Sequence, residues 1–254
     1  MDLGGRSILV TREEEKAWET AREVERAGGI PIVFPTIATQ PMEDPGPLKE
    51  AIGRVGEFDW VAVTSRTGAR VLVELARDLG VFLGGVRLAA VGSGTADELR
   101  KAGLDVAVVP KRQDGEGLAM AMASTAPLGR VLVLKAMEGR DTLATMLVAA
   151  GFNVQTVAAY RTVVASHTDD EVRSLLSGPR PDAALFMSPS AFHGLLAILG
   201  TGVALHWLAD VFLVAIGPVT ADAMARSGAT VGLVAAEPRV ASVLDELVRR
   251  FARR

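Results

Sequence analysis

The chain has 254 residues, a net charge of −3 and no cysteine; 49% of its residues are hydrophobic and 22% are charged. This composition supplies enough apolar side chains for packed cores, and the missing cysteines exclude disulfides and thiolate metal sites. The negative charge argues against a general nucleic-acid-binding protein, the N-terminus lacks the apolar core of a signal peptide, and no apolar run approaches the roughly 18 residues of a membrane span. We therefore expect a soluble cytoplasmic protein with no nucleic-acid or membrane partner.

Short apolar runs alternate with amphipathic segments along the chain. The apolar runs are bounded by turn residues and predict buried strands, whereas the amphipathic segments predict helices. Strands are expected at 7–11, 30–34, 59–64, 106–109, 130–134, 153–158 extended by 160–164, 182–187 and 211–216. Helices are expected at 13–27, 47–55, 118–125, 138–150, 168–177, from 188 onward, 221–226 and 241–254. This alternation predicts an α/β protein with parallel sheets covered by helices on both faces.

Three pairs of segments repeat at nearly constant separation, which indicates a tandem duplication. Two strand-to-helix transitions match well, whereas the strand near the N-terminus matches less well. The pairs are 59–65 with 182–188 (182 − 59 = 123), 91–97 with 216–222 (216 − 91 = 125), and 5–10 with 129–134 (129 − 5 = 124). Two copies are too few for a solenoid, so two similar domains are expected.

Four strand-to-helix turns carry hydroxyl groups or glycine. They are Thr64-Ser65, Gly92 to Thr95, Ser188-Pro189-Ser190, and Gly217 to Thr220. Ser188 is a favourable N-cap, and Pro189 suits the first position of a helix. Unpaired backbone N–H groups point out of each helix start, and these turns collect at the carboxyl edges of parallel sheets. The sequence therefore predicts anion sites at those edges.

Motifs of other site classes fit less well. The run from Gly92 to Asp97 is similar to a dinucleotide-binding fingerprint, but Asp97 stands where a third glycine or alanine must pack. There is no Walker-type phosphate loop, and the three histidines lack the spacing of metal ligands. Ser65 and Ser188 could act as nucleophiles. Neither lies in a Gly-x-Ser-x-Gly elbow, so helix capping is the stronger interpretation of both.

Tyr160 is the only tyrosine in the chain. It can be interpreted as an ordinary aromatic residue at a strand end with an exposed hydroxyl. It can equally be interpreted as a proton donor, because a phenol is protonated at neutral pH and can donate a hydrogen bond to a leaving oxygen. The residues alone leave these two interpretations even.

A series of short segments runs through nearly the whole chain. The segments are Val10-Thr11-Arg12, Pro35, Phe58-Asp59 with Thr64-Ser65, Val91-Gly92 with Thr95-Ala96, Gly139-Arg140, Ala159-Tyr160-Arg161, Ser188-Pro189-Ser190, and Ala215 to Pro218 with Thr220-Ala221. In order and spacing this series resembles the uroporphyrinogen-III synthase family. Two positions depart from the family pattern: Lys135-Ala136 stand where an Arg-Gly pair is usual, and Met187 stands where Thr is frequent.

The resemblance implies a bilobed fold of two doubly wound parallel-sheet domains joined by a two-stranded connector. One domain would combine residues 1–36 with 166–254, and the other would comprise residues 37–165. The proline-rich segment 35–47 and the polar junction at 165–170 fit these crossings. Segments 36–40 and 160–165 would form the connector strands.

The resemblance also implies a reaction. The family closes the linear tetrapyrrole hydroxymethylbilane to uroporphyrinogen III, with inversion of ring D and loss of water, and uses no metal and no organic cofactor. The partner implied for this chain is that small molecule alone, with the protein as a monomer. The many carboxylates of the substrate suit the hydroxyl turns and helix starts described above.

Site residues follow from the same resemblance. Tyr160 would be the catalytic residue, and no residue would bind a metal. The substrate-binding residues would be Arg12, Ser65, Arg66, Gly92, Thr95, Arg140, Ser188, Pro189, Ser190, Gly217 and Thr220. Lys135 and Arg161 are further cations that could face the carboxylates.

Two other functions remain open. A non-catalytic, bilobed sensor of a polycarboxylated small molecule would share every anion-site feature and lack only the chemistry. An α/β transferase acting on phosphorylated metabolites is disfavoured because the phosphate loop is missing.

Overall fold

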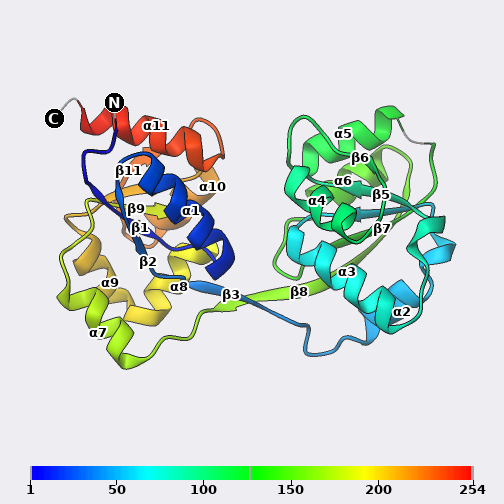
Figure 1. The fold of residues 1–254 in the computed structure, drawn as a ribbon, viewed down its shortest axis with the longest axis horizontal. Coiled ribbons are helices and arrows are strands. Elements are labelled where there is room, and N and C mark those ends of the chain that lie inside the picture. The colour runs from blue at the N-terminus through cyan, green and yellow to red at the C-terminus, as the bar shows by residue number, and fades with distance from the viewer. Residues whose placement is uncertain (1, 126, 253–254) are drawn as a thin grey trace. The chain divides into compact units, whose positions relative to one another are not determined.

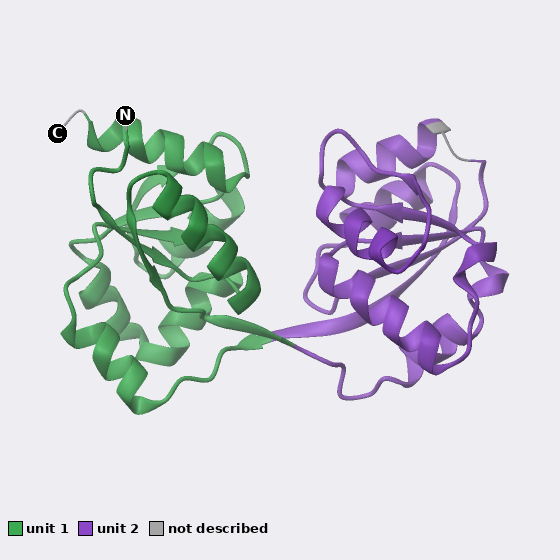
Figure 2. Cartoon of the chain, viewed as in Figure 1, with its two compact units in different colours: residues 1–39, 163–254 green, residues 40–162 purple. Residues whose placement is uncertain are grey.

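The chain forms two compact units, seen in a computed structural model that describes residues 2–125 and 127–252. Unit 1 comprises Met1–Thr39 and Val163–Arg254, and unit 2 comprises Gln40–Thr162 (Figure 2). The boundaries expected from the sequence, after residues 36 and 165, each lie three residues from these positions. Residues 1, 253 and 254, which belong to the expected first domain and tail helix, lie outside the described residues.

Helices and strands alternate within each unit (Figure 1). Unit 1 contains β1 (Ser7–Val10), α1 (Glu14–Arg26), β2 (Ile30–Val33), most of β3 (Ile37–Gln40), α7 (Asp169–Ser177), β9 (Ala183–Phe186), α8 (Pro189–Leu199), α9 (Thr201–Leu208), β10 (Phe212–Ala215), α10 (Pro218–Arg226), β11 (Val231–Val234) and α11 (Val240–Phe251). Unit 2 contains α2 (Gly46–Gly53), η1 (Val55–Glu57), β4 (Trp60–Val63), α3 (Arg66–Asp78), η2 (Leu83–Gly85), β5 (Arg87–Ala90), α4 (Ser93–Lys101), β6 (Val106–Val108), α5 (Gly115–Thr125), β7 (Arg130–Ala136), α6 (Thr142–Ala149) and most of β8 (Asn153–Val164).

The two sheets have the same strand order, which confirms the duplication. The first sheet runs β11-β10-β9-β1-β2, and the second runs β6-β5-β4-β7-β8 and then β3. Under the repeat found in the sequence, β4, β5 and β7 correspond to β9, β10 and β1. The chain visits the two sheets in different sequence order, because β1 and β2 precede the rest of their sheet whereas β7 and β8 follow the rest of theirs. The chain crosses between the units within β3 and within β8, which are neighbours in the second sheet.

The register of the weakest repeat differs by one residue from the sequence match. Trp60 pairs with Val131, and its counterpart Ala183 pairs with Ile8, so the structural separation is 131 − 8 = 123 rather than 124. A pair of aspartates confirms this register. The carboxylate of Asp59 accepts a hydrogen bond from the backbone N–H of Arg130, and the carboxylate of Asp182 accepts one from the N–H of Ser7, both at 2.8 Å.

Each sheet packs helices against both faces, because side chains alternate along a strand. In unit 1, Leu9 and Phe186 face a core formed with α8, α9 and α10, whereas Ile8 and Leu185 face a core formed with α1 and α11. In unit 2, one core is formed with α2, α3 and α4 and the other with α5 and α6. The central strands β4 and β9 are therefore buried at every residue, as expected for parallel sheets.

Helices α8 and α9 meet at Gly200, whose φ of 79° lies in the left-handed region that favours glycine. The two helices are bent by 111° at this break. No single helix among the described residues is long and apolar enough to cross a membrane, and this bent pair meets the length and composition criteria only when its two helices are taken together.

Asp182 ties the start of β1 to β9, and we expect its replacement to make stability less dependent on pH. Partial burial opposes ionisation, but hydrogen bonds from Ser7 and Arg6 outweigh it and hold the pKa of Asp182 below its usual value. A lowered pKa stabilises the fold above the unfolded-state pKa of about 4, and that stabilisation is lost as the pH falls through the folded-state pKa. Asp182→Asn should therefore lower the free energy of unfolding by about 1 kcal/mol at pH 7. Urea titrations at a series of pH values should show the difference from wild type shrinking below about pH 4; a difference that is constant with pH would contradict the ionic interpretation.

Candidate active site

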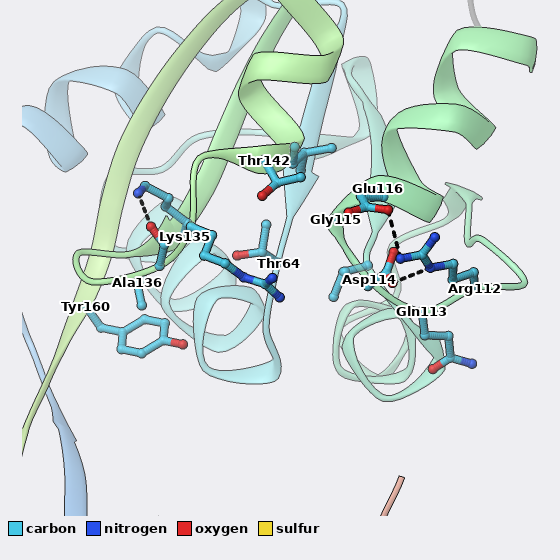
Figure 3. Close-up of a pocket in the computed structure, with 14 residues that line it drawn as sticks. Thr64, Arg112, Gln113, Asp114, Gly115, Glu116, Lys135, Ala136, Thr142 and Tyr160 are labelled. Carbon is cyan, nitrogen blue, oxygen red and sulfur yellow. Dashed lines mark hydrogen bonds and ion pairs between the residues drawn. The ribbon is translucent and has the colours of Figure 1, made fainter. Parts of the chain in front are cut away.

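A pocket of about 400 Å³ lies within unit 2 at the carboxyl edge of its sheet (Figure 3). Residues in or directly after four neighbouring strands line it. These residues are Thr64 after β4, Val91 after β5, Lys135 and Ala136 at the end of β7, and Tyr160 in β8. The opposite wall is the segment from Arg112 to Glu116, which leads from β6 into α5. The pocket thus occupies the position at which open parallel sheets bind ligands.

Tyr160 enters the pocket because β8 is irregular at this point. Lys135 pairs with Ala158 while the next residue, Ala136, pairs with Tyr160, so Ala159 is an extra residue in the ladder. Such bulges re-aim side chains and are frequent beside active sites. The side chain of Tyr160 is only 8% exposed and packs into the core beneath α3. Figure 3 shows its hydroxyl directed inward from the wall opposite the Arg112 to Glu116 segment.

The loop between β7 and α6 is held against β8. Met137 N–H donates to the carbonyl of Tyr160 at 2.8 Å, and Thr162 N–H donates to Oε2 of Glu138 at 2.8 Å. The ammonium of Lys135 donates to the carbonyl of Gly139 and forms an ion pair with Asp141 at 2.7 Å. The prediction of a helix from residue 138 was wrong, because these contacts keep the segment as a loop and α6 begins at Thr142.

Arg140 is the cation of this pocket that is available to a ligand. Its side chain is exposed and makes no hydrogen bond or ion pair to other described residues. Arg112, in contrast, is paired with Asp114 at 2.5 Å and with Glu116 at 2.8 Å, and the hydrogen bond to Asp114 raises the pKa of Arg112 above its usual value. Lys135 is occupied by its contacts with the loop. Of the predicted site residues, Arg140 and Tyr160 line the pocket.

The predicted anion site at the start of α4 is filled by a side chain of the protein. Oε1 of Gln113 accepts hydrogen bonds from the N–H of Ser93 at 3.1 Å and from its hydroxyl at 3.3 Å. Gly92 permits this approach, since a Cβ there would lie 2.6 Å from the same oxygen. Thr95 is 5% exposed and turned into the core. The sequence did not indicate the role of Gln113, because its partner lies 20 residues away.

The other predicted residues of unit 2 lie at the same sheet edge. Ser65 caps α3, and its hydroxyl accepts a hydrogen bond from Gly68 N–H at 2.9 Å. Arg66 follows it and lies against the first turn of α4, where a Cβ on Gly94 would be 2.5 Å from its Nε. The edge therefore groups Ser65, Arg66 and Gly92 near the pocket without making them part of its lining.

Six predicted residues belong to unit 1 and form a separate group at the carboxyl edge of the first sheet. They are Arg12, Ser188, Pro189, Ser190, Gly217 and Thr220. The hydroxyl of Ser188 accepts a hydrogen bond from Ala191 N–H at 3.1 Å, which makes it the N-cap of α8. Arg12 donates to the hydroxyl of Thr20 at 3.2 Å, and Thr220 is 3% exposed.

Histidine and acidic side chains do not converge on a metal-binding arrangement in the described part of the chain. No group of three or more such residues lies close enough there to hold an ion. His167 instead stacks on Phe34 with ring centroids 4.0 Å apart, and its Nε2 lies 2.6 Å from the carbonyl oxygen of Pro35.

Comparison with known proteins places the chain in a family. Residues 19–245 match the family model described as uroporphyrinogen-III synthase HemD. A "putative uroporphyrinogen-III synthase" of Methanothermobacter thermautotrophicus is 30% identical over 88% of this chain and 90% of its own length. The porphyrin biosynthesis protein HemD of Ruminiclostridium josui is 25% identical over 97% of this chain, which spans about half (49%) of that protein.

A solved structure shows the same fold. The uroporphyrinogen-III synthetase of Helicobacter pylori aligns with a TM-score of 0.66 and 18% identity over 97% of this chain and 99% of its own. The match to the family model, which covers most of the chain, decides the assignment. The chain belongs to the uroporphyrinogen-III synthase family, whose members are cyclising enzymes of tetrapyrrole biosynthesis.

Proposed function

We propose that this chain closes hydroxymethylbilane to uroporphyrinogen III, with inversion of ring D and loss of water. Family membership supports the reaction class. The observation that carries the proposal is the pocket of unit 2, where a buried phenol, Tyr160, and an unpaired cation, Arg140, share one cavity. A phenol can donate a proton, and a guanidinium can bind a carboxylate with two parallel hydrogen bonds.

In this proposal Tyr160 assists the departure of the hydroxyl group. The bond between the hydroxymethyl carbon and its oxygen breaks while the phenol donates its proton, so that water leaves. The lone pair of the adjacent pyrrole nitrogen supports the resulting cation. The substituted α-carbon of ring D attacks it, the bond from that carbon to the bridge toward ring C then breaks and re-forms at the free α-carbon, which inverts ring D, and the proton lost from the free α-carbon returns to the phenolate. Hydroxide is a poor leaving group, so general acid assistance is worth about 10²–10⁴-fold in rate. Positioning of the coiled substrate between its reacting ends supplies the remaining rate acceleration.

The carboxylates of the substrate would meet the polar sheet edges. In unit 2 we assign Arg140 to this role, with Ser65, Arg66 and Gly92 around the helix starts; Thr95 is turned into the core and is left out. In unit 1 we assign Arg12, Ser188, Pro189, Ser190 and Gly217; Thr220 is buried and is left out. Because Gln113 already occupies the start of α4, a carboxylate could bind Ser93 N–H only by displacing that amide. We further infer a cytoplasmic monomer that needs no metal and no organic cofactor.

The direct test is incubation with hydroxymethylbilane. The products are oxidised, and uroporphyrin isomers I and III are separated by chromatography. Spontaneous closure without inversion gives isomer I, so heat-treated protein should yield only that isomer. Isomer III from the native protein would support the proposal. Isomer I alone, together with measurable binding of the substrate, would favour the non-catalytic sensor.

Replacing Arg140 should weaken substrate binding with little effect on the chemical step. Loss of one charge-assisted contact costs about 1.5–3 kcal/mol, of which exposure to water removes a part, so Arg140→Ala should raise KM roughly tenfold. Initial rates against hydroxymethylbilane concentration would measure this. Lys49→Ala removes an exposed cation of α2 and controls for the loss of one positive charge from unit 2. It should leave KM unchanged. Equal effects of the two variants would remove Arg140 from the site.

A further inference from the structure

Beyond Tyr160 itself, the loop that follows β7 fixes the segment of β8 that carries it. Strand β7 ends at Ala136, the residue that pairs with Tyr160. The hydrogen-bonded pairing of β8 with β7 therefore ends at Tyr160. Residues two apart in a strand present their N–H groups to the same neighbour. The N–H of Thr162 therefore points to the side that β7 has left, and an unpaired backbone N–H is unfavourable.

Glu138 supplies the missing acceptor. Its Oε2 accepts the N–H of Thr162 at 2.8 Å, while Met137 N–H donates to the carbonyl of Tyr160 at 2.8 Å. These two hydrogen bonds hold the backbone of β8 at Tyr160 and at Thr162. Between them, the guanidinium of Arg161 pairs with Glu43. Three consecutive residues of β8 are thus anchored immediately after the bulge.

We infer that Glu138 is a positioning residue for Tyr160, acting through the backbone of β8 rather than by contact with substrate. This inference rests on the proposed function of Tyr160. The bulge at Ala159 aims the phenol into the pocket, and a bulge is a local departure from regular pairing that needs fixed neighbours to hold one geometry. A carboxylate side chain that replaces a strand carbonyl performs that task here. Loss of Glu138 would let Tyr160 sample several orientations, only some of them productive.

Tyr160 offers a readout that does not depend on activity, because it is the only tyrosine in the chain. Protein labelled with ¹³C in the tyrosine ring gives ring signals from this residue alone. Glu138→Ala should shift and broaden those signals, whereas Glu138→Gln, whose amide oxygen still accepts the Thr162 N–H, should keep them near the wild-type position. Glu50→Ala removes an exposed carboxylate of α2 in the same unit and should leave the tyrosine ring signals unchanged. Unchanged tyrosine signals in Glu138→Ala would overturn the inference.

The kinetic test is a double-mutant cycle. Glu138→Ala should lower kcat three- to tenfold with KM within twofold, and Glu138→Gln should restore at least half of kcat. In the Tyr160→Phe background, Glu138→Ala should have no further effect, since the group that it positions is gone. An equal loss in both backgrounds would show that Glu138 acts independently of Tyr160. If wild-type protein forms no isomer III, the proposed function fails, while the tyrosine signals still decide whether Glu138 positions the ring.

Discussion

Tyr160→Phe is expected to lower kcat by about 10²-fold, the small end of the range for general acid assistance. The substitution removes one oxygen from a ring that is 8% exposed and packed in the core of unit 2, so the fold should be preserved. KM should change little, because carboxylate contacts rather than the phenol hold the substrate. Steady-state rates, with the isomers separated after oxidation, would measure both effects. The inverted isomer should still form, since positioning does not depend on the hydroxyl.

Stability measurements make that result interpretable. Thermal unfolding of Tyr160→Phe should stay within a few degrees of wild type, which would assign the loss of rate to chemistry. Full kcat in a folded Tyr160→Phe protein would remove the phenol from catalysis and leave a mechanism of positioning alone.

Gly194→Ala is expected to cause the largest loss of stability, about 3 kcal/mol. A Cβ at this position in α8 would lie 2.3 Å from the carbonyl oxygen of Thr36 and 3.0 Å from its carbonyl carbon. Thr36 cannot retreat easily, because it is completely buried and its hydroxyl is 2.6 Å from the carbonyl oxygen of Ala191, while its own carbonyl accepts the N–H of Ala165 at 3.1 Å. The melting temperature should fall by about 6–12 °C in calorimetry.

Gly202 in α9 provides the matched control. It is also a helical glycine, but a Cβ there would meet nothing within 4 Å. Gly202→Ala should stabilise the protein by up to about 1 kcal/mol, because alanine is the better helix former. A melting temperature for Gly194→Ala equal to that of wild type would mean that α8 can move away from Thr36.

The α/β alternation and the duplication could be predicted because they depend on local apolar periodicity. Strand β11 was missed, and its sequence explains why. Gly232 interrupts the strand and weakens the local signal, yet a Cβ there would lie 2.5 Å from the ring of Phe212 in the neighbouring strand. Helix α9 was missed for a related reason, since it continues directly from α8 after the turn at Gly200. Gly232 is required by its contact with a neighbouring strand, whereas Gly200 is favoured by its own left-handed backbone and has no atom of another element within 4 Å of a Cβ.

The candidate site could be predicted only in part. The family resemblance named Arg140 and Tyr160, and both line the pocket at the carboxyl edge of the second sheet, where the rule for open parallel sheets expects ligands. The roles of Gln113 and Glu138 could not be found in this way, because their partners, Ser93 and Thr162, lie 20 and 24 residues away. A polar side chain that completes a helix start or a strand edge at such a distance leaves no pattern in the local sequence.

The different order in which the chain visits its two sheets has a consequence for synthesis on the ribosome. Unit 2 is one continuous run, so all of its strands have emerged soon after residue 162. Strand β1 pairs with β9 through Ile8 and Ala183, which are 183 − 8 = 175 residues apart. At roughly 5–20 residues per second, β1 waits about 10–35 s for this partner. During that interval β1 and β2 form at most a two-stranded fragment with one apolar edge unpaired, too small to be stable alone. The first residues to leave the ribosome are thus among the last to reach their native pairing. We therefore expect a holdase chaperone to bind the segment of β1 and β2.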